Sequence, residues 1–213
     1  MAGYTYTTLV QAIKDFTDNT ETVFVSQIDN FIQNAEERIL KMLAPLEVFR
    51  KNSSAAMTSG NKYLPKPSDW LHTYSLSIND GSGDDTVFLL NKDVNFVQEY
   101  WPDSTSTGTP KYYADFDVST FIIAPTPNAN WAVEVHYFYR PQSITAAASG
   151  ETWLGTNAGS LLLYACLVEA YTFMKGEPDM LQIYEQKFMQ EAERKALFAV
   201  QAEGLDFYRK SAA

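Results

Sequence analysis

The stretch AVEVHYFYRP, residues 132–141, indicates the fold most clearly. Alternate side chains of an extended strand point to opposite faces, so one face carries Val133, Val135, Tyr137 and Tyr139 and the other carries Ala132, Glu134, His136 and Phe138. The first face is expected to lie in a core, and the second is expected to be wetter. We therefore predict a half-buried strand here and interpret the flanking segments relative to it.

Toward the N-terminus, residues 46–141 keep the short period of a β region. Turn-forming segments such as Thr58-Ser59-Gly60-Asn61 and Asn79-Asp80-Gly81-Ser82-Gly83 separate short apolar or aromatic runs. These runs cover residues 46–50, 73–78, 86–90, 111–116 and 120–123. A short helix is expected over Lys92–Trp101, ended by Pro102. We predict an antiparallel β domain, folded as a sandwich or an open barrel.

Residues 1–45 have helical spacing instead. Thr8 and Gln11 have the form of a capping box at the start of a first helix. A second helix is expected from about Ser26 until Pro45 stops it. Its apolar stripe consists of Ile28, Phe31, Ile32, Ala35, Ile39, Met42 and Leu43. These residues predict an N-terminal helical hairpin.

Helical spacing also returns after the last strand. Residues 142–157 are expected to form a polar linker or extended loop, which ends in a tight element over Trp153–Asn157. Residues 158–213 then predict one helix up to Gly176 and a long helix from Pro178 to about Ala202. The fold class is α+β: a helical bundle, four-helical in its simplest packing, built from N- and C-terminal helices around an inserted antiparallel β-sandwich or open barrel.

The charge and composition exclude several classes of function. The 213 residues include 26 Asp and Glu against 16 Lys and Arg, a formal charge of −10. This balance argues against gripping nucleic acid, which needs clustered cations. The N-terminal residues have neither the basic nor the apolar region of a signal peptide, and the longest apolar stretch, Leu161–Met174, is shorter than the ~20 residues of a membrane span. An aromatic content of 14% predicts apolar surface that meets a protein partner.

Few residues offer catalytic or ligand-binding chemistry. His136 shares a strand face with Glu134 and is expected to be a surface or subunit-contact residue, and the same is expected of His72, in a loop after Trp70. Cys166 lies in an apolar helix and is expected in the core. No nucleophile sits in a recognisable catalytic context. We therefore predict neither an enzyme nor a cofactor.

Two binding sites for small ligands stay open as alternatives. Asp80, Asp84 and Asp85 in the loop 79–85 offer oxygen ligands for Ca²⁺, although a solvated hairpin tip is the more typical interpretation. A carbohydrate-binding β-sandwich, attached to a virion or secreted, would stack sugars on Trp131, Tyr137 or Tyr139. Glycan binding by the isolated protein would favour that rival.

The C-terminal end carries exposed-type aromatics beyond a helix-breaking glycine. Residues 203–213 read EGLDFYRKSAA, and they form either a frayed end or a docking peptide. Phe207 and Tyr208 would gain from a surface that covers them.

Four stretches, in order along nearly the whole chain, resemble adaptor proteins of tailed bacteriophages, the head-to-tail connectors also called tail tubular protein A in short-tailed phages. The stretches are LVQAIKDFTDNTETVFVSQIDNFIQNAEERIL (9–40), FLLNKDVNFVQEYWP (88–102), GTPKYYADFDVSTFIIAPTPNANWAVEVHYFYRP (108–141) and TWLGTNAGSLLLYACLVEAYTFMKGEPDM (152–180). The resemblance implies a structural virion protein of the phage neck or tail, which is in the host cytoplasm during assembly.

The resemblance also implies partners and surfaces. It implies a homo-oligomeric ring, typically of twelve copies, that joins the portal protein to the tail nozzle or tube and lets double-stranded DNA pass through an acidic lumen without gripping it. The candidate lumen acids are Glu36, Glu37, Glu185 and Glu193. The candidate portal-docking residues are Leu205, Phe207, Tyr208, Arg209 and Lys210. Trp153, Leu154 and Asn157 are the residues expected to reach a neighbouring subunit.

Overall fold

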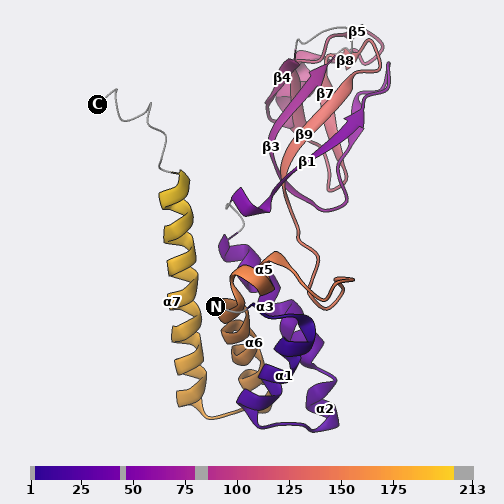
Figure 1. The fold of residues 1–213 in the computed structure, drawn as a ribbon. Helices are drawn as coiled ribbons and strands as arrows, with labels where there is room; N and C mark the ends of the chain where they lie inside the picture. The colour runs from indigo at the N-terminus through magenta and orange to yellow at the C-terminus, as the bar shows by residue number, and fades with distance from the viewer. Residues whose placement is uncertain (1–2, 44–46, 80–85, 204–213) are drawn as a thin grey trace, which may run out of the picture. The chain divides into compact units, whose positions relative to one another are not determined.

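The structure, a computed structural model, describes residues 3–43, 47–79 and 86–203 (Figure 1). The chain divides into a helical unit, made of Met1–Glu47 and Pro141–Ala213, and a β unit, made of Val48–Arg140. The α+β fold class agrees with the prediction.

The helical unit contains helices from both ends of the chain. They are α1 (Tyr6–Thr17), α2 (Thr22–Val25), α3 (Ile28–Leu43), α5 (Trp153–Asn157), α6 (Gly159–Met174) and α7 (Pro178–Glu203). The capping box of α1 was predicted at Thr8 and Gln11, but it is formed by Thr5 and Thr8. The Thr5 side chain accepts from the Thr8 N–H, and the Thr8 hydroxyl accepts from the Thr5 N–H at 2.9 Å. This exchange starts the helix one turn earlier than predicted.

Helix α6 is the centre of the helical unit. It contacts α1, α3, α5 and α7, and its buried side chains lie on more than one side of the helix. A helix that is apolar all round is typical of a buried position, and this explains why the stretch is apolar enough to resemble a short membrane span. No helix among the described residues is long and apolar enough to cross a membrane. The predicted four-helix bundle is a more specific arrangement than these contacts establish.

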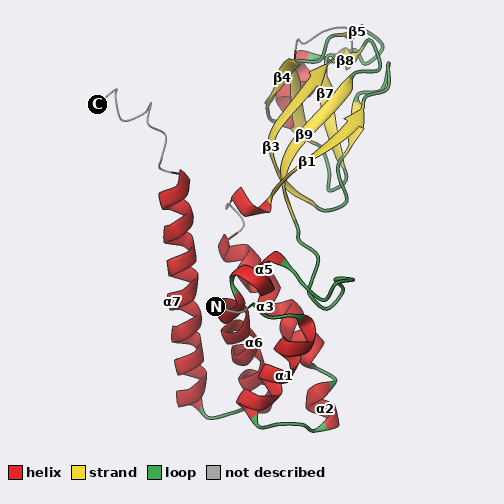
Figure 2. Cartoon of the chain, viewed as in Figure 1, coloured by secondary structure: helices red, strands yellow, loops and turns green. Residues whose placement is uncertain are grey.

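The β unit is built mainly of short strands (Figure 2). Its elements are the 3₁₀ turn η1 (Glu47–Phe49), β1 (Arg50–Ala56), β2 (Tyr63–Pro65), β3 (Trp70–Asn79), β4 (Thr86–Asn91), α4 (Val94–Tyr100), β5 (Thr107–Gly108), β6 (Tyr112–Asp115), β7 (Thr120–Ala124), β8 (Thr126–Pro127) and β9 (Ala132–Tyr139). Seven strands form a sheet in the order β1-β9-β3-β4-β6-β7-β2, and β5 pairs with β8.

The prediction of an antiparallel sandwich or open barrel is corrected in part. The described strands form a curled, mixed sheet, because β4 pairs with β6 in parallel after the α4 crossover, and β5 also pairs with β8 in parallel. The run 46–50 was predicted as a strand, but its described part is η1 followed by the first residue of β1. The sequence of β1, RKNSSAA, has too few apolar residues to stand out as a strand.

The core of the β unit lies on one face of the sheet. Val133, Val135 and Tyr137 of β9 are buried in it, which confirms the alternation seen in the sequence. The rest of this cluster comes from β2, β3, β4, β6, β7 and Met57. On the other face, α4 covers β6 and β7 through Val97, Ala114 and Ile122. The outer face of β1, β9, β3 and β4 is left without a covering helix among the described residues.

Polar contacts hold the β unit together at its margins. The Tyr137 hydroxyl donates to Asp69 at 2.7 Å, and Lys51 Nζ lies 2.9 Å from the other carboxylate oxygen of Asp69. Elsewhere the side chain of Lys66, only 2% exposed, places Nζ 2.9 Å from Asp115 and 3.7 Å from the centre of a Trp70 ring. A nearly buried ammonium group needs such partners, so these residues constrain how the strand ends pack.

Candidate interaction surfaces

The outer face of β1, β9 and β3 carries an aromatic and cationic cluster. The Arg50 guanidinium lies 4.6 Å from the centre of the Tyr74 ring and 5.4 Å from that of Phe138. Tyr74 lies at a register shift between Thr73 and Ser75, and its side chain is 60% exposed. His72 stacks on Phe138 with the ring centres 6.4 Å apart. The cluster presents flat apolar surface with one fixed cation, which suits contact with another protein.

Strand β4 and helix α4 extend this apolar surface. Phe88 and Leu90 of β4 are 64% and 58% exposed, although they are large apolar residues in the middle of a sheet. Phe96 and Tyr100 of α4 form edge-to-face pairs with Tyr112, at 5.3 and 4.9 Å between ring centres. Exposed apolar side chains gathered in this way mark a protein-contact surface more often than a ligand pocket.

The turn between β6 and β7 presents a second apolar surface. Val118 is 92% exposed at its tip, and Phe116 packs against Tyr63 with ring centres 5.2 Å apart. Asp117 orders the turn, because its carboxylate accepts from the N–H groups of Ser119 and Thr120, each at 2.7 Å. Hydrogen bonds from Thr120 and Ser119 lower the pKa of Asp117 to about 2.

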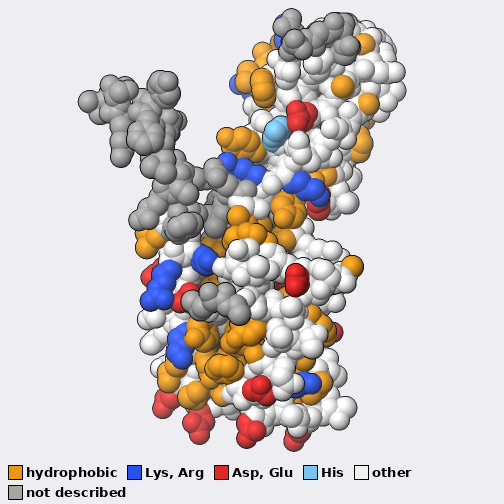
Figure 3. Space-filling view, viewed as in Figure 1, with side chains coloured by type: hydrophobic (Ala, Val, Ile, Leu, Met, Phe, Trp, Pro, Cys, Tyr) orange, Lys and Arg blue, Asp and Glu red, His pale blue; other side chains and the backbone are white. Residues whose placement is uncertain are grey.

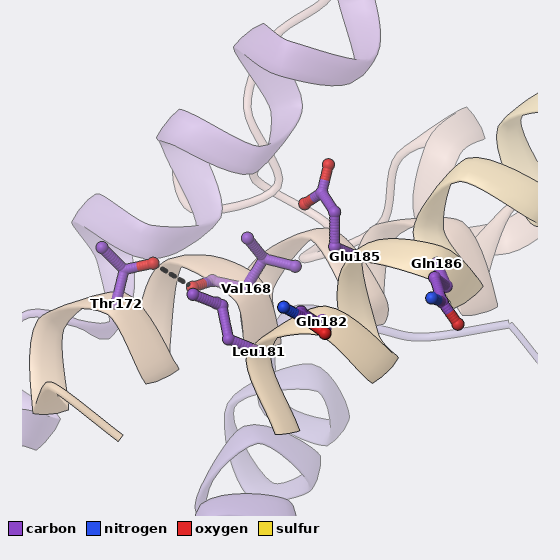
Figure 4. A pocket seen from close by; sticks show the side chains of 6 residues that line it. All are labelled: Val168, Thr172, Leu181, Gln182, Glu185 and Gln186. Atoms are coloured by element: carbon purple, nitrogen blue, oxygen red, sulfur yellow. Dashed lines mark hydrogen bonds between the residues drawn. The ribbon is translucent and has the colours of Figure 1, made fainter. Parts of the chain in front are cut away.

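A shallow groove lies between α6 and α7 in the helical unit (Figure 4). Its volume is about 450 Å³. The residues that line it are Val168, Thr172, Leu181, Gln182, Glu185 and Gln186. Glu185 forms an ion pair with Arg38 of α3, and the Arg38 guanidinium lies 4.6 Å from the centre of the Phe188 ring. The lining is mixed, with apolar Val168 and Leu181 beside the polar side chains of Thr172, Gln182, Glu185 and Gln186.

Helix α7 is apolar on more than its buried side. Tyr184, Phe188 and Ala192 are buried, while Ile183, Met189 and Leu197 are 42%, 40% and 61% exposed. Figure 3 shows hydrophobic side chains gathered over the α6 and α7 part of the unit on the side drawn. Helix α7 therefore offers apolar surface beyond its contact with α6.

The four acids that the resemblance suggested for a lumen have different environments. Glu36 accepts from the Ile144 N–H at 2.9 Å, and burial raises the pKa of Glu36 despite the hydrogen bonds from Ile144 and Ser143. Glu185 pairs with Arg38, and Glu37 lies 3.6 Å from Lys41 of the same helix. Glu193 is exposed on α7. Two of the four thus have partners on other segments of their own subunit, and their role toward DNA stays a prediction.

The segment predicted to reach a neighbouring subunit makes contacts within its own chain. Leu154 is 9% exposed, whereas Trp153 is 38% exposed on the short helix α5. The Asn157 carbonyl accepts from Lys195 of α7 at 2.5 Å. The preceding loop is anchored by Ile144, which is 1% exposed and donates its N–H to Glu36. Trp153 and Asn157 are thus exposed and Leu154 is buried, and the inter-subunit role stays a prediction.

Other predicted site residues are placed as follows. His72 lies in β3 and not in a loop, because β3 begins at Trp70. His136 Nε2 lies 3.3 Å from Glu134 Oε1 on the outer sheet face, and Asn52 donates to the same oxygen. Cys166 is buried, and burial raises the pKa of its thiol well above the ordinary value. Among the described residues, no group of three or more His, Cys, Asp or Glu could hold a metal ion.

Two predicted sites lie wholly or mostly outside the described residues. Asp80, Asp84 and Asp85 of the Ca²⁺ alternative belong to the segment 80–85, and the portal-docking residues belong to 204–213.

The sugar-stacking alternative is not supported. Tyr137 is 1% exposed and donates to Asp69, while Trp131 and Tyr139 are partly buried against the core. A fully buried ring such as that of Tyr137 has no open face on which a sugar could stack.

Sequence reasoning missed the surfaces with the most exposed apolar residues. The clearest available signal was Val118, an apolar residue between Asp117 and Ser119 in a turn. In β4 the run VFLL gave no sign of which face would lie open, because every position in it is apolar. Helix α4 covers β6 and β7, and its position determines which face of the sheet stays open at β4. The sequence does not indicate the path of the crossover that contains α4.

Comparison with known proteins agrees with a surface built for contact. No curated protein matches the chain. Residues 4–206 match the profile described as SU10 adaptor protein, which covers both the helical unit and the β unit. A match of this extent shows the family and indicates a structural adaptor role in a phage, at the neck or tail of the virion and in association with other phage structural proteins. The chain belongs to the SU10 adaptor protein family.

Proposed function

We propose that this protein is the subunit of a ring, of about twelve copies as in related connectors, that joins the portal of a tailed phage to its tail nozzle or tube. The observation that carries the proposal is the adaptor-family match over residues 4–206. The likeness to tail tubular protein A makes the proposal more specific, since that protein occupies the same position in short-tailed phages. No covalent chemistry is required of such a part.

A ring needs two different complementary surfaces on each subunit, because a head-to-tail contact repeats around the axis. The outer sheet face with Phe88 and Leu90 is one candidate, and the turn between β6 and β7 with Phe116 and Val118 is another. Both expose large apolar side chains next to one another, as surfaces that meet another protein do. In the proposed ring, both surfaces face neighbouring subunits, and Trp153 of the helical unit adds a separate lateral contact.

The helices around α6 would serve as the rigid body of the ring. We propose that α1, α3, α6 and α7 form the predicted four-helix bundle, which is consistent with the contacts of α6 with the other three. Helix α7 and residues 204–213, with Leu205, Phe207, Tyr208, Arg209 and Lys210, would dock against the portal, and the β unit would meet the nozzle. Apolar side chains continue along α7 as far as Leu197, which supports its use as a docking element.

The charge of −10 supports free passage of DNA through the ring. Carboxylates that face a bore repel phosphates, whereas lysines and arginines would hold them and slow ejection. Glu193, which is exposed on α7, is the strongest candidate among the four acids, because Glu36 and Glu185 are engaged by Ile144 and Arg38 and Glu37 lies 3.6 Å from Lys41. We expect no measurable binding of double-stranded DNA by the purified protein at physiological salt.

Deleting residues 204–213 tests the proposal. The truncated protein should keep its circular dichroism spectrum and melting temperature but fail to co-sediment with portal-bearing heads. The full chain is the positive control, and the double substitution Phe207→Ala, Tyr208→Ala should reproduce most of the loss. Normal binding by the truncated protein would show that the tail is not the docking element, and absence of binding by the full chain would argue against the adaptor role.

A further inference from the structure

The two edges of the seven-stranded sheet differ in what they offer to another strand. The edge strands are β2 and β1. β2 has three residues and includes Pro65, whereas β1 pairs with β9 without a register shift over seven residues. In antiparallel pairs, successive residues direct their N–H and C=O groups alternately toward the partner and away from it. The hydrogen bonds of each edge strand to its inner neighbour therefore tell which backbone groups point outward.

The outward positions of β2 are closed to a further strand. The Lys66 N–H donates to the Ser119 carbonyl and the Lys62 carbonyl accepts from Ile123, so the residues at even positions face β7. Tyr63 and Pro65 therefore face outward. The Tyr63 N–H donates to the Asn61 side chain at 3.0 Å, and Pro65 has no N–H. This edge offers no donor, which is a common protection against edge pairing.

The edge at β1 is open. The Met57 N–H donates to the Trp131 carbonyl at 2.8 Å, in the same register as the β1–β9 pairs, so the residues at odd positions face β9. Asn52, Ser54 and Ala56 therefore direct N–H and C=O outward. Within the part of the chain that the structure describes, these three N–H groups make no hydrogen bond. An edge of this kind is a template for another strand.

The side chains of β1 suit a second copy of the same strand. After Lys51 the strand contains only Asn, Ser and Ala, with no charge, proline or bulge. If two β1 strands run antiparallel with Ser54 opposite its own counterpart, Asn52 lies opposite Ala56 and Ser53 lies opposite Ala55. Lys51 then lies opposite Met57, which keeps the cationic ends of the two strands apart. In this register, the outward N–H and C=O groups of Asn52, Ser54 and Ala56 can all pair with those of the second strand, and no side chains of like charge lie opposite each other.

We propose that the open edge of β1 binds β1 of a second copy of this chain, antiparallel about a two-fold axis, so that the two sheets become one. The alternative of β1 against β2 of another copy is disfavoured, because β2 offers no outward donor. A two-fold contact uses the same patch on both subunits and closes at two copies. The β1–β1 dimer is therefore a state of the free protein and is separate from the head-to-tail contacts of the proposed ring. The inference does not depend on the proposed function.

The substitution Ser54→Pro tests this pairing in the full chain. Proline removes the outward N–H at the centre of the pairing and leaves the bonds to β9 intact, so it is compatible with an edge strand. Ser54→Ala is the matched control, because it changes the side chain and keeps the N–H. Sedimentation velocity over the micromolar range should show a concentration-dependent dimer for the parent chain and for Ser54→Ala, and about tenfold or more weaker association for Ser54→Pro.

Amide hydrogen exchange separates this contact from any other dimer. The N–H groups of Asn52, Ser54 and Ala56 should exchange quickly at low protein concentration and become protected as the dimer forms. Should Ser54→Pro melt at a much lower temperature than the parent chain, the exchange data on the parent alone decide the question. A monomer at every concentration, or a dimer in which these amides still exchange quickly, would overturn the inference. Protection that appears only when portal is added would assign the edge to another protein and overturn it as well.

Discussion

The helical unit and the β unit are stabilised in different ways. The centre of the helical unit is almost purely apolar, since eight residues of α6 are buried there and Phe188 of α7 is fully buried. The β unit also has an apolar core, but its margins depend on polar groups such as Tyr137 with Asp69 and Lys66 with Asp115. Loss of packing should therefore damage the helical unit most, whereas changes of pH should act mainly on polar contacts.

The largest expected effect is in the helical core. Phe188→Ala removes a fully buried ring of α7 that packs under the Arg38 guanidinium of α3. This loss should lower the free energy of unfolding by about 3 to 5 kcal/mol. Leu197→Ala on the same helix, where the side chain is 61% exposed, should change stability by about 0.5 kcal/mol or less. Urea denaturation followed by circular dichroism measures both. Equal effects of the two variants would contradict the placement of the core.

In the β unit, Tyr137→Phe should have a smaller effect of about 2 kcal/mol, because it deletes a hydrogen bond to a carboxylate while keeping the ring. Tyr74→Phe, on the exposed outer face, is the control and should be nearly neutral. Burial and the bond to Asp69 raise the pKa of Tyr137 to about 12. The stabilisation is therefore complete below the ordinary pKa of 10.0 and is lost as the pH rises through about 12. The Tyr137→Phe variant should lack this alkaline loss.

Glu36 should show that a half-buried carboxylate stabilises the helical unit through its acceptor oxygen and not through its charge. Glu36→Ala removes the acceptor of the Ile144 N–H and should cost about 1 to 2 kcal/mol, whereas Glu36→Gln keeps an acceptor and should be tolerated. Burial raises the pKa of Glu36 above 4.5, so the parent chain should lose stability relative to Glu36→Gln as the pH rises through that raised pKa. A greater loss in Glu36→Gln than in Glu36→Ala at neutral pH would refute this role.

The smallest effect is expected at the turn between β6 and β7. Its Asp117 should titrate at about 2 in a carboxyl NMR experiment, below the ordinary 3.8, because Thr120 and Ser119 donate to its charged form. The contribution to stability is present above the ordinary pKa and is lost as the pH falls through about 2. Removing the side-chain donor, by Ser119→Ala, should bring the pKa part of the way back, because the Ser119 hydroxyl lies 3.0 Å from the carboxylate. A titration at the ordinary value in the parent chain would show that the turn is not ordered by this carboxylate.

The extent to which the fold was predictable follows the strength of each local pattern. Helix α3 and strand β9 have one apolar face each, and both were predicted nearly to the residue. β1 was missed, because its seven residues are small and polar and it is held mainly through its backbone pairing with β9. The parallel pair β4–β6 depends on the path of α4, which no periodicity encodes.

The candidate surfaces were harder to predict than the fold. The sequence correctly indicated much apolar surface from its aromatic content, but it assigned Tyr137 to a possible sugar platform that is in fact core. Whether an aromatic residue lies in the core or on the open face of a sheet depends on which face another element covers. Glu36 was selected as a surface acid because helical spacing places it on a polar side, and only the fold of the loop around Ile144 shows what it contacts.

The central claim is that this chain acts as one of many identical subunits around a channel. Electron microscopy of the purified protein mixed with the portal of its phage tests it most directly. We expect a closed ring of copies of this chain beneath the portal, with carboxylates and few cations facing the bore. Portal particles that carry no such ring, or a ring whose bore is lined by lysine and arginine, would contradict the account.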